Sequence, residues 1–154
     1  MNAPAAGALV LVPNTLDLGA EAVDIRDVLP DGVLREAARL THWVAEDAKT
    51  ARAFLKRAAN VYPLAQPLLA IDIRELPRPR KGARDGGAPP SEAWQALLAP
   101  ALAGHDVGLL SEAGLPAVAD PGAALVAAAH DRGIRVRPLP GPSSLMLALA
   151  ASGL

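Results

Sequence analysis

The chain has 154 residues, 51% of them hydrophobic and 20% charged, which is enough apolar material for the core of one domain. Its formal net charge of −1 gives no overall attraction to nucleic acid or to an anionic membrane surface. The sequence contains no cysteine, which excludes disulfides and thiolate chemistry and fits the reducing cytoplasm. The apolar run Ala8–Pro13 is too short for a signal peptide or a membrane span, so we expect neither.

Predicted strands and helices alternate along the chain. Short aliphatic runs predict strands at Ala8–Val12, Thr41–Ala45, Leu68–Ile73, Asp106–Leu110 and Ile134–Val136. Capping residues and helical spacing predict helices from Asp31 to about Leu40, Ala48 to about Ala59, Ser91 to about Leu102, Gly122 to Arg132, and from Pro142 onward. This alternation, with continuously apolar strands, predicts a three-layer α/β/α fold around a mostly parallel sheet of about five strands.

Basic residues occur in two places of different character. The predicted helix after Asp47 carries Lys49, Arg52, Lys56 and Arg57, which we expect on its exposed face. The stretch from Pro77 to Ser91 is rich in proline and glycine and predicts a mobile surface loop. Its Arg78, Arg80, Lys81 and Arg84 could contact phosphates, but a charged loop of this kind is more often only solvated.

A long connection from Ser111 to Gly122 follows the fourth predicted strand. Asp120 precedes Pro121 and Gly122, a pattern typical of a helix start with a capping carboxylate. The same pattern can aim free backbone N–H groups at an anionic ligand, and Gly114 would let the backbone approach that ligand closely. Most strand-to-helix loops are shorter, which favours a binding loop here.

A second rigid corner follows the fifth predicted strand, at Pro138-Leu139-Pro140-Gly141-Pro142-Ser143-Ser144. It could be only a stiff turn, because each proline fixes φ and removes a donor. Stiffness is also what a wall that positions a ligand needs. In an open α/β sheet both corners would meet at the edge that binds ligands, so together they predict a binding site.

Other candidate groups are weaker. Glu46 and Asp47 follow the second predicted strand, where Asp47 could cap a helix or either carboxylate could orient a substrate or accept its proton. His42, His105 and His130 lack the spacing of metal ligands, and we expect no metal site. The sequence has no dinucleotide-binding glycine motif, no P-loop and no nucleophile elbow around its serines.

Several of these motifs together resemble the tetrapyrrole (corrin/porphyrin) methylases, which depend on S-adenosylmethionine. The resemblance rests on Ala45–Asp47, Ser111–Gly114, Pro116, Asp120–Gly122, Pro138–Pro142 and Ala151–Leu154. It is greatest to the branch that contains the bacterial ribosomal RNA small subunit 2′-O-ribose methyltransferase. Members of that branch usually have Asp and Thr where this chain has Glu112 and Leu115.

The resemblance implies that residues 1–154 form the N-terminal domain of a two-domain cytoplasmic methyltransferase, usually a homodimer, and that a C-terminal domain is absent from this chain. The methyl acceptor would be an RNA ribose or a small molecule. If the attacking group is a hydroxyl, Glu46 or Asp47 is the candidate catalytic residue, as its base or as a group that orients the substrate. The residues implied to bind the cofactor are Ser111, Glu112, Ala113, Gly114, Pro116, Asp120, Pro121, Gly122, Pro140, Gly141 and Ser143.

Two other functions remain open at this stage. The chain could be a binding or self-association module that lacks half of the cofactor cleft. It could also bind a nucleotide or sugar phosphate at an ordinary doubly wound sheet edge, with the phosphate at the helix starts after Asp120 or Gly141.

Overall fold

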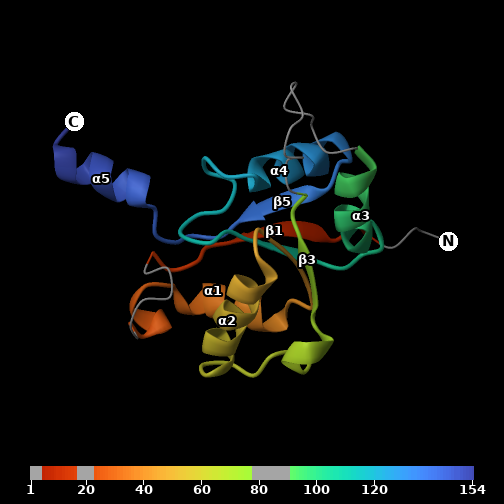
Figure 1. Cartoon of the computed structure of the whole chain (residues 1–154), viewed down its shortest axis with the longest axis horizontal. Coiled ribbons are helices and arrows are strands. Elements are labelled where there is room, and N and C mark those ends of the chain that lie inside the picture. The colour runs from red at the N-terminus through yellow and green to blue at the C-terminus, as the bar shows by residue number, and fades with distance from the viewer. Residues whose placement is uncertain (1–4, 17–22, 78–90) are drawn as a thin grey trace.

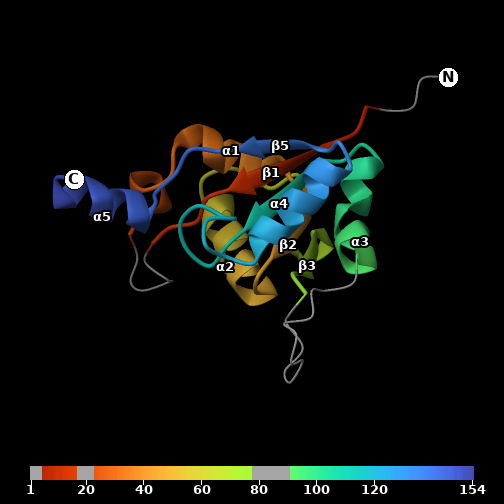
Figure 2. The ribbon, with the colours of Figure 1, turned by 90° about the horizontal axis from the view of Figure 1, so that it is seen from above.

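The structure is a computed structural model that describes residues 5–16, 23–77 and 91–154, and the predicted loop residues 78–90 lie outside that part. Helices cover both faces of a central sheet (Figures 1 and 2). The strands are β1 (Ala8–Val12), β2 (His42–Ala45), β3 (Asp72–Glu75), β4 (Val107–Leu110) and β5 (Arg135–Pro138). The α-helices are α1 (Asp31–Arg39), α2 (Ala48–Ala59), α3 (Ser91–Leu102), α4 (Gly122–Asp131) and α5 (Ser144–Ser152).

The sheet has five strands in the order β3-β2-β4-β1-β5, and every pair is parallel. Side chains alternate between its two faces. Val10 and Val12 of β1 pack with α1 and α2, whereas Leu9 packs on the other face with α3 and α4. The predicted three-layer fold is therefore confirmed, with one apolar core on each side of the sheet.

The third strand was predicted wrongly. Leu68–Ala70 forms a 3₁₀ turn, and β3 is the charged segment Asp72–Glu75. The strand lies at the edge of the sheet and its side chains are partly or fully exposed, so it does not need aliphatic residues. The prediction from aliphatic content therefore started the strand at Leu68, four residues before its observed start at Asp72.

Two helix starts also differ from the prediction. Asp31 is the first residue of α1 and pairs with Arg35 rather than capping the helix, and Pro30 holds the cap position without a side-chain bond. Helix α5 begins at Ser144 rather than at Pro142, because the Ser143 hydroxyl accepts the Met146 amide. The cap of α2 by Asp47 is confirmed.

Helix α5 extends away from the rest of the molecule (Figure 1). Leu145, Met146, Leu147 and Leu149 are each about half exposed or more. Nothing in the described chain covers these side chains. Within the described residues, no helix is long and apolar enough to cross a bilayer.

Candidate functional site

The predicted binding corners meet at the carboxyl edge of the sheet. Leu110 at the end of β4 lies opposite Val12 of β1 on one side and Ala45 of β2 on the other. The chain segments that follow these three strands therefore start at the same level. The segment after β5 joins them, because Leu11 of β1 accepts the Leu139 amide.

Asn14 ties the segment after β1 to the segment after β4. Its backbone exchanges hydrogen bonds with Gly114, at 2.9 and 3.2 Å, and its side-chain amide donates to the carbonyls of Ser111 and Glu112. Asn14 is 5% exposed, so these bonds satisfy polar groups that water does not reach. This buried asparagine fixes the position of the first half of the β4–α4 loop.

Two glycines allow the chain to pack closely against itself at this edge. Gly114 has a φ of +67°, and a β-carbon there would lie 3.2 to 3.3 Å from Leu16 and the Pro142 carbonyl. A β-carbon at Gly141 would lie 2.3 Å from the Pro13 ring. Gly114 was expected to let a ligand approach the backbone closely, and part of that space is occupied by Leu16 and the Pro142 carbonyl of the protein itself.

Asp120 holds the second half of the loop. Its carboxylate accepts the amides of Gly122 at 2.7 Å and Ala117 at 2.8 Å. Ala117 and Ala119 have positive φ angles of 66° and 56°, a conformation that alanine adopts only under constraint. The expectation that this helix start offers free N–H groups is wrong for Gly122, because the protein's own carboxylate occupies that amide.

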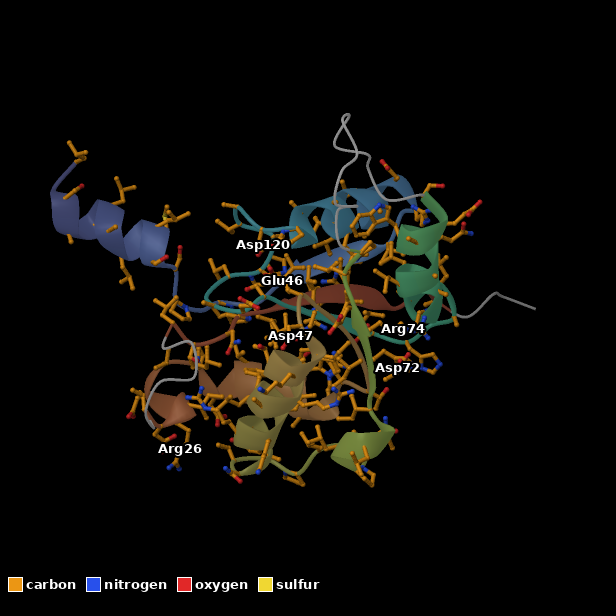
Figure 3. All side chains as sticks on the ribbon, in the orientation of Figure 1. Arg26, Glu46, Asp47, Asp72, Arg74 and Asp120 are labelled. Carbon is orange, nitrogen blue, oxygen red and sulfur yellow. The ribbon has the colours of Figure 1, made fainter. Side chains whose placement is uncertain are left out.

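Carboxylates gather at this edge. Glu46 accepts the Glu112 amide at 3.4 Å, and Figure 3 shows it on the same side of the sheet as Asp120. Burial raises the pKa of Glu46, and the charges of Asp120 and Glu112 raise it further against the opposing hydrogen bond. Burial also raises the pKa of Asp120, although its two amide donors oppose that shift. Glu46 is therefore a stronger base than an exposed glutamate.

The remaining predicted residues lie on these same two corners with different exposures. Ser111 and Pro116 are buried, and the Ser111 hydroxyl donates to the Ala113 carbonyl. Ala113 and Ser143 are half-buried, whereas Pro121 and Pro140 are exposed. The Asp47 carboxylate lies at the start of α2, where it accepts the Thr50 amide at 2.7 Å and caps the helix.

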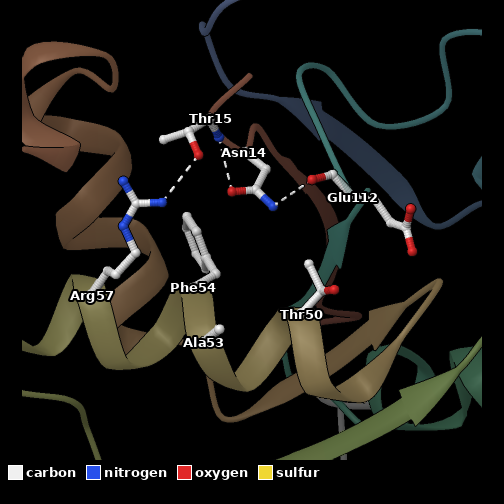
Figure 4. Close-up of a pocket in the computed structure, with 7 residues that line it drawn as sticks. All are labelled: Asn14, Thr15, Thr50, Ala53, Phe54, Arg57 and Glu112. Carbon is white, nitrogen blue, oxygen red and sulfur yellow. Dashed lines mark hydrogen bonds between the residues drawn. The ribbon is translucent and has the colours of Figure 1, made fainter. Parts of the chain in front are cut away.

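A cavity of about 350 Å³ lies beside this edge (Figure 4). Helix α2 lines it with Thr50, Ala53, Phe54 and Arg57, and Asn14, Thr15 and Glu112 complete the lining. Arg57 is half-buried, not on the exposed face as expected, and it donates to the Thr15 hydroxyl and the Val23 carbonyl. Sequence reasoning missed this cavity, although the spacing of its four helical residues marks one face of α2.

The histidines also show an arrangement that their spacing did not reveal. The rings of His42 and His105 stack with their centroids 5.0 Å apart, at the start of β2 and just before β4. Burial lowers the pKa of His42, and the charge of His105 lowers it further. No group of three metal-binding side chains occurs among the residues that the structure describes.

Comparison with known proteins places the sequence beside methylases. The tetrapyrrole (corrin/porphyrin) methylase family matches residues 34–154. The curated relatives include proteins named ribosomal RNA small subunit methyltransferase I. The one from Mesorhizobium japonicum is 54% identical over 63 residues, which are 41% of this chain and 21% of that protein. Those from Xylella fastidiosa and Escherichia coli O157:H7 are 53% identical over 53 residues (34% of this chain, 19% of the relative) and 47% over 60 (39% and 21%).

These matches cover only about a fifth of the length of each relative. The 63 residues matched in the Mesorhizobium japonicum protein are 41% of this chain but only 21% of that protein, which is therefore about twice as long as this chain.

Proposed function

The chain belongs to the tetrapyrrole (corrin/porphyrin) methylase family, and on this premise we propose that it provides one wall of the methyl-donor site of an RNA methyltransferase. The observation that carries the proposal is the carboxyl edge itself. There the β4–α4 loop and the Pro140–Ser143 corner both lie within the matched region. The loop is bound to Asn14, donates its Glu112 amide to Glu46, and packs closely against the corner at Gly114 and Pro142. The relatives' names support RNA as the methyl acceptor.

The residues at this edge fit S-adenosylmethionine in their charge. The cofactor carries an ammonium group, a sulfonium cation and one carboxylate, so its net charge is positive, and Glu46, Glu112 and Asp120 offer three carboxylates to its cationic groups. Asp120 already occupies the Gly122 amide, so this edge is better suited to the cofactor's cationic groups than to a phosphate. When bound, S-adenosylmethionine supplies an electrophilic methyl group, so the protein needs no covalent intermediate.

We assign the residues of this chain two tasks. The clamped loop from Ser111 to Gly122, with Pro140, Gly141 and Ser143, would hold the cofactor in a fixed orientation. Glu46 would accept the proton of an attacking hydroxyl, because its raised pKa makes it a better base. Asp47 is the weaker candidate for that task, since its carboxylate is used at the Thr50 amide.

We also propose that a second α/β domain supplies the opposite wall of the cofactor cleft. The greater length of the relatives supports this, and the exposed apolar side chains of α5 suit a contact with such a domain or with the second copy of a homodimer. Action on ribosomal RNA would place the protein in the cytoplasm.

Ribosomal RNA from cells with and without the gene tests the proposal. Mass spectrometry should show the loss of one ribose methyl group from the small-subunit RNA when the gene is deleted. A gene copy that encodes the wild type or Glu92→Gln should restore it, because Glu92 is exposed on α3. A copy that encodes Glu46→Gln should fail. An unchanged methylation map in the deletion strain would refute RNA methylation.

A further inference from the structure

The cavity beside α2 has features that the methyl-donor site does not use. It opens between one face of that helix and the segment after β1, next to the loop that we assign to the cofactor. In Figure 4, the Arg57 guanidinium and the Thr50 hydroxyl lie on the helical side and Asn14 and Thr15 face them. The Arg57 guanidinium and the Thr50 hydroxyl are hydrogen-bond donor groups, which is the chemistry that phosphate oxygens need, whereas the Asn14 amide already donates to the Ser111 and Glu112 carbonyls.

Helix α2 is also strongly basic. Its twelve residues carry Lys49, Arg52, Lys56 and Arg57 and no acidic side chain. Lys49, Arg52 and Lys56 are exposed. The chain as a whole has a net charge of −1, so this concentration is local. Such a helix attracts a polyanion and orients it along the surface.

The cavity has opposite character at its two ends. Arg57 lies at one end, and Glu112 lies at the other with its carboxylate pointing away from the arginine (Figure 4). The Glu112 backbone amide donates to Glu46, the proposed proton acceptor. A nucleotide with its phosphate near Arg57 would thus have its sugar on the side of the reacting carboxylate.

From this arrangement we propose that the cavity binds a backbone phosphate of the acceptor RNA and that α2 guides the strand through Lys49, Arg52 and Lys56. The inference rests on the proposed function for the identity of the polyanion, and it is carried by Arg57 and Thr50, which are not assigned to the cofactor. The acceptor RNA would therefore reach the methyl-donor site from the side of α2. Arg57 and Thr50 would be binding residues with no part in the proton transfer.

A charge placed in the cavity tests this most cleanly. Ala53 is exposed and lines the cavity, so Ala53→Glu adds a carboxylate without removing any bond. Ala59→Glu is the matched control, because it adds the same charge to the same helix at an exposed position that does not line the cavity. Fluorescence anisotropy would measure binding of a labelled single-stranded RNA of about ten nucleotides to each protein.

We expect Ala53→Glu to weaken RNA binding about tenfold or more, and Ala59→Glu to weaken it only slightly. Arg57→Gln should also lower the slope of log affinity against log salt by about 0.7, the value for one phosphate contact on a single strand. Circular dichroism would confirm that each variant keeps its helices. Absence of RNA binding by the wild type, or equal losses in the two alanine variants, would overturn the inference.

Competition experiments identify the source of the phosphate. A nucleoside 5′-monophosphate should compete far less well than the RNA, since it lacks the charges that α2 would contact. If it competes equally, the cavity is a mononucleotide site and the RNA assignment fails. Equal displacement by poly-glutamate would point to an acidic protein and would also overturn the assignment.

Titration with S-adenosylhomocysteine separates this inference from the proposed function. Intact cofactor binding with RNA binding that is insensitive to Ala53→Glu would overturn only the RNA site. RNA binding that is lost in Ala53→Glu, in a protein with no affinity for the cofactor, would support the RNA site and refute the methyl-donor wall proposed for this chain.

Discussion

Replacing Asp120 with alanine is expected to loosen the β4–α4 loop and to destabilise the fold by about 2 kcal/mol. The substitution removes two short hydrogen bonds from a carboxylate, at 2.7 and 2.8 Å. Such bonds contribute about 1.5 to 3 kcal/mol each, so their sum is about 3 to 6 kcal/mol. Two effects reduce it. Water can reach the partly exposed site, and relaxation relieves Ala117 and Ala119, whose positive φ angles cost about 1 kcal/mol each.

Urea unfolding followed by circular dichroism would measure this change. Asp131→Ala is the matched control, since Asp131 is exposed at the other end of the same helix, and it should change the free energy of unfolding by less than about 0.5 kcal/mol. If Asp120→Ala unfolds within about 0.5 kcal/mol of the wild type, the carboxylate does not hold the loop. The same variant should lose affinity for S-adenosylhomocysteine, because the loop would no longer be preorganised.

Three further predictions concern this edge and the histidine pair. Ala117→Gly should leave the free energy of unfolding unchanged or raise it by up to about 1 kcal/mol, because relief of the positive φ offsets the added backbone entropy of the unfolded chain. A loss of about 1 kcal/mol, as for glycine inside a helix, would contradict the strain. Gly141→Ala should destabilise by about 1 to 3 kcal/mol, because the new β-carbon overlaps the Pro13 ring, and a thermal melt unchanged from wild type would show that the corner can shift. The pKa of His42 is lowered in the folded state, so the unfolded chain binds more protons in acid, and stability should fall as the pH drops through about 6.5 and below. Unfolding of wild type and His42→Gln across this pH range would test it, and an equal pH slope in both proteins would exclude the titration of His42 as the cause.

The parts of the fold that local chemistry controls could be predicted from the sequence. The parallel three-layer sheet follows from alternating apolar strands and helical patterns, and the Asp47 cap follows from a carboxylate before a helical run. The errors arise where tertiary position overrides composition. At the sheet edge β3 is charged, and at the start of α5 the Ser143 hydroxyl, rather than Pro142, sets the boundary.

The candidate site shows the same division. The two corners were predicted as binding loops from glycine, proline and loop length, and the structure brings them to one edge. Their residue-level binding roles stay a prediction. What joins the site spans long separations in sequence: Arg57 reaches Thr15 across 42 residues, and Glu46 meets Glu112 across 66. No local pattern reports such contacts, so the cavity and the carboxylate cluster required the fold.

The central claim is that the carboxyl edge of this sheet is a wall of the methyl-donor site. The most direct test is an NMR titration of isotope-labelled protein with S-adenosylhomocysteine, in which the backbone amide resonances are recorded. Such a titration detects binding even at millimolar affinity. The account predicts shifts at Glu112, Gly114, Gly141 and Ser143, and none at Gly104 or Gly133, which lie at the opposite edge. Shifts confined to the opposite edge, or no shift at saturating ligand, would contradict it.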